Sequence, residues 1–73
     1  MDDAVFNRTF LPDEADTALM ILHHITGMEN SSNMKNIAHD LQLGLGVIRV
    51  VIKRAKAAGL VHHMGPPTVY FVL

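Results

Sequence analysis

Residues 33–61 restrict the possible folds of this chain most strongly, because they predict two helices joined by a tight turn. The first helix is expected over residues 34–41, where the side-chain oxygen of Asn33 can cap its first turn. The second is expected over residues 45–58. Between them Gly44 can adopt a positive φ angle at little steric cost. The remaining elements must therefore pack around this helical pair.

The expected helix over residues 45–58 carries an apolar face and a neighbouring basic face. Apolar side chains recur at helical spacing at Ile48, Ile52 and Ala55. Basic side chains recur at the same spacing, about a quarter-turn away, at Arg49, Lys53 and Lys56. Like charges at this spacing destabilise a helix by roughly 0.2–0.5 kcal/mol per pair, and no acid lies between them to offset this. The pattern favours an anionic partner, and a basic second helix in such a pair is typical of nucleic-acid binding.

The charges of the whole chain are distributed unevenly, although the net charge is only −1. Residues 1–40 hold all seven acids and two bases, Arg8 and Lys35, for a net charge of −5. Residues 41–73 hold four bases and no acid, for a net charge of +4. Such asymmetry between the halves of a chain also indicates an anionic partner.

The length and composition limit the class of protein. A chain of 73 residues forms one small domain near the lower limit for a core without disulfides, metal or oligomerisation, and its 49% hydrophobic content favours a surface that meets another chain. The absence of cysteine excludes disulfides and thiolate zinc sites. No basic leader and no apolar run of membrane-spanning length is visible, so a cytoplasmic protein without membrane contact is expected.

The N-terminal third predicts an arm followed by one helix. Residues 1–12 lack a clear period and are expected to form an N-terminal arm, whose apolar side chains either cover the domain's own core or clasp a second protomer; for residues 1–4 the equal alternative is partial disorder. Residues 14–26 predict a helix with a structural role, capped by Asp13 and ended by Gly27.

The C-terminal segment predicts a two-stranded hairpin. Residues 60–64 predict a short extended segment, residues 68–73 are rich in β-branched and aromatic side chains, and Pro66 and Pro67 between them belong at the tip or on an edge. Alternation in the last strand makes both of its faces largely apolar, which leaves one face for a partner. Residues 13–73 are thus expected to form one mainly α domain with a small β-hairpin.

The order of these elements, with the string IAHDLQLGLGVIRVVIKRAKAAGLVHHMGPPTVYFVL, resembles the winged helix-turn-helix domains of bacterial transcription regulators such as the MarR-like, ArsR-like and PapI-like families. The resemblance covers residues 13–73 and implies three helices plus a two-stranded wing. It also implies that the helix over residues 45–58 is a recognition helix in the major groove. The positions facing the bases would then be Leu45, Gly46, Arg49, Val50 and Lys53.

The candidate DNA-binding residues follow from this interpretation. Arg49 is the best candidate for a bidentate contact to guanine, with Lys53 beside it, and Lys56 and Arg54 are expected on phosphates. The candidate set is completed by Gly46, where the backbone can approach a phosphate, and by Val50, Lys35 and His63. One protomer would neutralise few phosphates, so a homodimer is expected, paired through the N-terminal arm, the hairpin face or both.

The expected function is that of a sequence-specific DNA-binding regulator, a small repressor or co-regulator, and there is one alternative to it. A winged helix can instead serve as a protein-interaction module without DNA binding, which Val50 and the uncharged segment Gly65–Pro67 favour. Neither pair of neighbouring histidines has the spacing of a chelate, so we expect no metal and no cofactor. No phosphate-binding loop or nucleophile paired with a base is present, so we expect no enzymatic activity.

Overall fold

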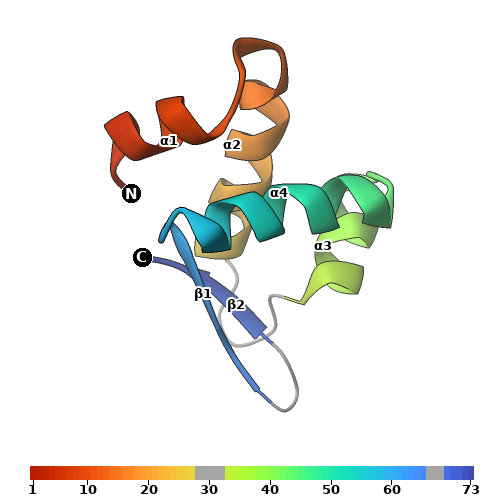
Figure 1. Ribbon diagram of the computed structural model, residues 1–73. Coiled ribbons are helices and arrows are strands. Elements are labelled where there is room, and N and C mark those ends of the chain that lie inside the picture. Colours follow the sequence, from red (N-terminus) through yellow and green to blue (C-terminus); the bar gives the residue numbers. More distant parts are fainter. Residues whose placement is uncertain (28–32, 66–68) are drawn as a thin grey trace.

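The computed structural model describes residues 1–27, 33–65 and 69–73 (Figure 1). These residues form four helices and one antiparallel two-stranded sheet. The elements are α1 (Asp3–Thr9), α2 (Pro12–Gly27), α3 (Met34–Leu41), α4 (Leu45–Ala57), β1 (Val61–Met64) and β2 (Val69–Val72). The prediction of a mainly α domain with a small hairpin is confirmed, but the expected count of three helices is wrong because a fourth lies at the N-terminus.

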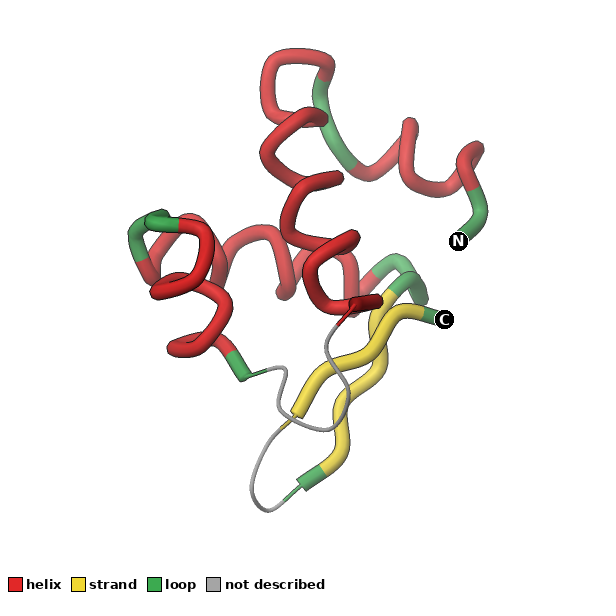
Figure 2. The backbone as a smooth tube through the Cα atoms, turned by 180° about the vertical axis from the view of Figure 1, so that it is seen from behind, coloured by secondary structure: helices red, strands yellow, loops and turns green. Residues whose placement is uncertain are grey.

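The other helices pack around α4, and the hairpin extends from one end of the helical part (Figure 1). The view from behind shows α1 and α3 on opposite sides of α2, whereas α4 contacts all three of these helices (Figure 2). The two termini lie close together in both views, and Met1 and Leu73 line the same shallow groove. The C-terminal end of α4 leads toward the chain ends, since the backbone N–H of Leu73 donates to the oxygen of Leu60 at 2.9 Å, while α3 lies on the other side of α2 (Figure 2).

One hydrophobic core joins all the helices and the hairpin. Its fully buried large side chains come from α2, α3 and α4: Ile21, Leu22, Ile25, Ile37, Ile48 and Ile52. The inward face expected for the second helix of the pair is confirmed, because Ile48, Ile52 and Ala55 are all buried. Tyr70 and Val72 of β2 pack against the edge of this core. The buried face of α4 fixes which of its side chains remain available at the surface.

The N-terminal segment is helical, so the expectation of an arm without regular structure is wrong over α1. The carboxylate of Asp2 accepts from the backbone N–H groups of Ala4 (3.0 Å) and Val5 (3.3 Å), which caps the helix. Phe6 and Phe10 are buried, with their ring centroids 5.1 Å apart. The apolar side chains of this segment were expected either to cover the domain's own core or to clasp a second protomer. Phe6 and Phe10 cover the core. Seven residues are too few to show a helical period clearly.

Helix α2 begins one residue before the expected cap. Pro12 is its first residue, where a fixed φ angle suits a helix and a missing N–H is no loss. The expectation that Asp13 caps this helix is therefore wrong, since Asp13 lies in the first turn. Glu14 instead accepts from the backbone N–H of Leu11 at 2.9 Å. This is the side-chain half of a capping box. The helix ends at Gly27, one residue beyond the predicted end at residue 26.

The turn between α3 and α4 uses a different residue from the one expected. Gln42 has a φ angle of +57°, whereas Gly44 has a φ of −64°. The expectation of a positive φ at Gly44 is therefore wrong. The backbone N–H of Leu43 donates to the oxygen of Ala38 at 3.1 Å, which closes α3 with a left-handed residue at its end. The predicted cap by Asn33 is confirmed at 3.0 Å from the backbone N–H of Asn36.

The hairpin pairs Val61 with Val72 and Met64 with Val69 in antiparallel register. Helix α4 ends at Ala57 rather than Ala58, and Gly59 leads out of it with a φ of +79°. The expected turn prolines and the polar connection over residues 28–32 lie outside the described residues.

Replacing Gly44 with serine is expected to stabilise the domain by about 1 kcal/mol. Gly44 is the N-cap of α4, has extended backbone angles, and makes no side-chain cap bond. A Cβ there would meet nothing within 4 Å. Urea unfolding measures the change. The matched variant Gly59→Ser should instead destabilise, because an L side chain at a positive φ is strained by roughly 1–2 kcal/mol. A destabilised Gly44→Ser variant would contradict the observed turn.

Candidate nucleic-acid interface

The basic row of α4 lies at the surface. Arg49, Lys53 and Lys56 are exposed, about a quarter-turn round the helix from its buried residues. Within the described part of the chain, neither Arg49 nor Lys53 forms an ion pair. Their charges are therefore available to an anionic ligand.

The last member of the row connects α4 to the hairpin. The Nζ atom of Lys56 lies 3.5 Å from Nε2 of His63 on β1. His63 is paired in register with Tyr70 of β2, and their ring centroids are 6.2 Å apart. The structure thus brings together two candidates that the sequence suggested separately. The polar surface of α4 continues onto β1 at this point.

Arg54 differs from the other bases of α4 because it forms an ion pair with Glu14 of α2. Its Nη1 donates to both carboxylate oxygens of Glu14, at 2.7 and 2.8 Å. This ion pair links α4 to the first turn of α2. The pairing joins residues 40 positions apart, and no local signal in the sequence indicates it. We therefore leave Arg54 out of the proposed DNA contacts.

Glu14 is held in its ionised form by two donors. The backbone N–H of Leu11 lowers the pKa of this carboxyl below its ordinary value of 4.5, and the Arg54 guanidinium lowers it further. The folded chain therefore binds a proton at Glu14 less readily than the unfolded chain. The resulting stabilisation is present above pH 4.5 and is lost as the pH falls through the lower pKa of the folded state.

Replacing Glu14 with glutamine should lower the melting temperature at neutral pH, because the favoured carboxylate is removed. The difference from the original chain should shrink as the pH falls through the lowered pKa of the folded state, below which the carboxyl is protonated in both states. Thermal unfolding followed by circular dichroism across this range measures the effect. Arg54→Met should reproduce part of it, since the Leu11 donor remains. Equal melting temperatures at neutral pH would exclude this role for Glu14.

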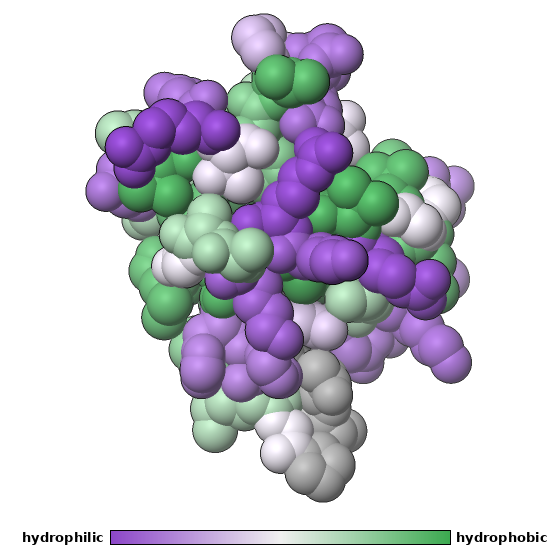
Figure 3. Space-filling model, viewed as in Figure 1, coloured by the Kyte–Doolittle hydropathy of each residue, from purple (hydrophilic) through white to green (hydrophobic). Residues whose placement is uncertain are grey.

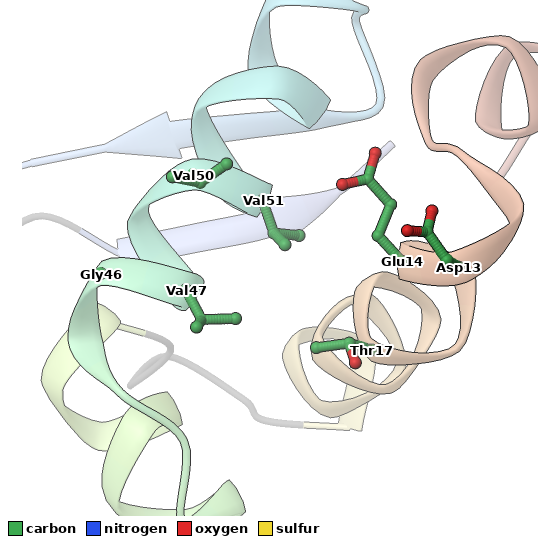
Figure 4. A pocket seen from close by; sticks show the side chains of 7 residues that line it. All are labelled: Asp13, Glu14, Thr17, Gly46, Val47, Val50 and Val51. Atoms are coloured by element: carbon green, nitrogen blue, oxygen red, sulfur yellow. The ribbon is translucent and has the colours of Figure 1, made fainter.

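The remaining candidate DNA-binding residues lie at two different places on the surface. Lys35 is exposed on the first turn of α3. Gly46 and Val50 line a groove between α4 and the first turns of α2, with a volume of about 450 Å³. In Figure 4 the valines of α4 lie opposite Thr17 and the acids Asp13 and Glu14. Val50 is 49% exposed. The sequence had not indicated that this edge of α4 faces acidic side chains of α2.

The surface over α4 shows both kinds of chemistry. Hydrophilic and hydrophobic atoms lie side by side across this face in Figure 3. The exposed apolar side chains of α4 are Val47 and Val50, at 43% and 49%. An anionic ligand and an apolar ligand would thus meet different edges of one helix.

Two histidines meet one carboxylate away from α4. Nε2 of His24 lies 3.1 Å from Oδ2 of Asp40, and Nδ1 of His39 lies 3.5 Å from Oδ1. The contact of His24 links α2 to α3, whereas His39 and Asp40 are neighbours on α3. Across residues 1–27, 33–65 and 69–73, no group of three histidine or acidic side chains is arranged to hold a metal ion.

Comparisons with protein-family models, curated proteins and solved structures gave no match for this chain. Among the described helices, none has the length and apolar character that crossing a membrane requires.

Proposed function

We propose that this chain is a winged helix-turn-helix regulator that binds double-stranded DNA with α4 in the major groove. The observation that carries the proposal is the exposed basic row of Arg49, Lys53 and Lys56, which continues onto β1 at His63. A helix pair with a short turn and an exposed basic second helix has the arrangement used for this purpose. A cytoplasmic repressor or co-regulator is the role that we infer.

The proposed contacts divide by chemistry. Arg49 reads a guanine edge, because its guanidinium can donate two parallel hydrogen bonds. Lys53 and Lys56 contact phosphates, with His63 extending the contact toward the hairpin. The first turn of α4 has no side-chain cap, and the backbone oxygen of Gly44 accepts from the N–H groups of Val47 and Ile48, which leaves those of Leu45 and Gly46 to meet a further phosphate. Lys35 lies on the adjoining helix as an additional cation.

We further propose a homodimer that pairs through the outer face of the hairpin. His62 lies opposite Phe71 in the register, and their rings meet edge to face at 5.1 Å. Phe71 and Leu73 are 36% and 62% exposed on this strand. Pairing would bury them and double the number of phosphate contacts. Sedimentation equilibrium measures the mass, and a single-chain mass with and without DNA would exclude the dimer.

Fluorescence anisotropy with a labelled duplex, repeated over a series of salt concentrations, tests DNA binding. We expect affinity to fall as salt rises, and Lys53→Ala to reduce the slope of log affinity against log salt by about 0.9, the value for one phosphate contact. Arg8→Ala, an exposed base on α1, serves as the control and should leave the slope unchanged. A folded sample that shows no binding at low salt would overturn the proposal.

A further inference from the structure

Helix α4 has a second exposed edge that the proposed DNA contacts do not explain. Val47 and Val50 stand one turn apart and are 43% and 49% exposed. Exposed valines one turn apart form a continuous apolar strip on a helix. This strip faces the beginning of α2 rather than the hairpin, where Lys56 meets His63. The strip therefore belongs to a surface different from the basic row.

The strip forms one wall of the α2–α4 groove, which we define by the residues that line it: Asp13, Glu14, Thr17, Gly46, Val47, Val50 and Val51. Figure 4 shows Val47 and Val51 directed from α4 toward α2, with Thr17 opposite them. A side chain at Gly46 would meet nothing within 4 Å, so the groove is open at that end. Its volume of about 450 Å³ suits the side chains of a short segment.

The charges on the opposite wall restrict what can enter. Asp13 is exposed, and no described residue donates to it. Glu14 already binds Arg54 and the Leu11 backbone, so its charge is partly neutralised. A phosphate or an acidic peptide would be repelled here, whereas a lysine or arginine would find an unpaired carboxylate.

We propose that the α2–α4 groove binds a short segment of a partner protein in which aliphatic residues stand next to a lysine or arginine. The aliphatic side chains lie over Val47 and Val50, and the basic side chain pairs with Asp13. This combination satisfies both walls, since the apolar strip gains burial and the carboxylate gains a cation. The proposal does not depend on DNA binding, because it uses a different edge of α4.

Selection of random short peptides displayed on phage against the immobilised whole chain tests this proposal without assuming a sequence. We expect the enriched peptides to combine aliphatic residues with lysine or arginine. Binding of one enriched peptide, followed by fluorescence polarisation, should weaken about tenfold in Val47→Ser, which loses two buried methyl groups. It should weaken about threefold in Asp13→Asn, which keeps the shape and removes the charge.

Controls separate these effects from misfolding. Asp3→Asn removes an exposed carboxylate from α1, outside the groove, and should leave peptide binding unchanged. Circular dichroism and thermal unfolding confirm that each variant is folded. Enrichment of acidic peptides, no enrichment, or equal binding by a folded Val47→Ser variant would overturn the proposal. A change in the oligomeric mass of Val47→Ser would also overturn it, because it would assign the groove to a second copy of this chain.

Discussion

Replacing Phe10 with alanine is expected to destabilise the domain by about 3–5 kcal/mol. Phe10 is 4% exposed and packs against Phe6 in the common core, so its removal leaves a cavity between α1 and the rest of the helices. Small domains are stable by only about 5–15 kcal/mol in total, and a chain of this length lies toward the lower end. A substantial unfolded population at ambient temperature is the expected result, measured by urea unfolding.

Leu11→Ala provides the matched control. Leu11 is adjacent in the chain but 64% exposed, so its truncation should change the free energy of unfolding by less than about 0.5 kcal/mol. The comparison distinguishes a helix that belongs to the core from a segment that only lies near it. If Phe10→Ala unfolded at the same urea concentration as the original chain, α1 would not contribute to the core.

The sequence-based predictions were accurate where the interactions join residues close together in the chain. They were wrong where the interactions join residues far apart in the chain. Met34–Leu41 was predicted with its true bounds, because its cap and its apolar spacing are signals within a few residues. Helix α1 was missed because its stability depends on burying Phe6 and Phe10 against residues much later in the chain. The left-handed residue of the turn was assigned to Gly44 from glycine's conformational freedom, whereas Gln42 adopts that conformation as α3 closes.

The same distinction applies to the candidate interface. The spacing of Arg49, Lys53 and Lys56 predicted one exposed row, because a single helix determines their relative positions. The pairing of Arg54 with Glu14 depends on how α4 packs on α2, so no pattern along the chain could indicate it. That pairing matters for function, since it leaves two arginines on one helix with different freedom to bind a ligand.

Arg49→Ala should weaken binding to the preferred DNA sequence by about 10–100-fold, the effect of losing a contact worth roughly 1–3 kcal/mol. Binding to unrelated duplexes should fall much less, because only the phosphate contact of one cation is lost there. The discrimination between sequences should therefore decrease. Arg49 is exposed and forms no ion pair with any described residue, so its guanidinium is free to make this contact.

Arg54→Ala is the matched arginine variant, and it should change DNA affinity little because Glu14 already holds that guanidinium at 2.7 Å. Selection of a preferred site from random duplexes supplies the specific probe, and anisotropy titrations of both variants against that site and an unrelated duplex measure the two affinities. An equal loss in both variants would indicate that general positive charge drives binding. A larger loss of affinity in Arg54→Ala would mean that the ion pair with Glu14 breaks when DNA binds. Arg54, on the edge of α4 beside α2, would then be the base-contacting residue instead of Arg49.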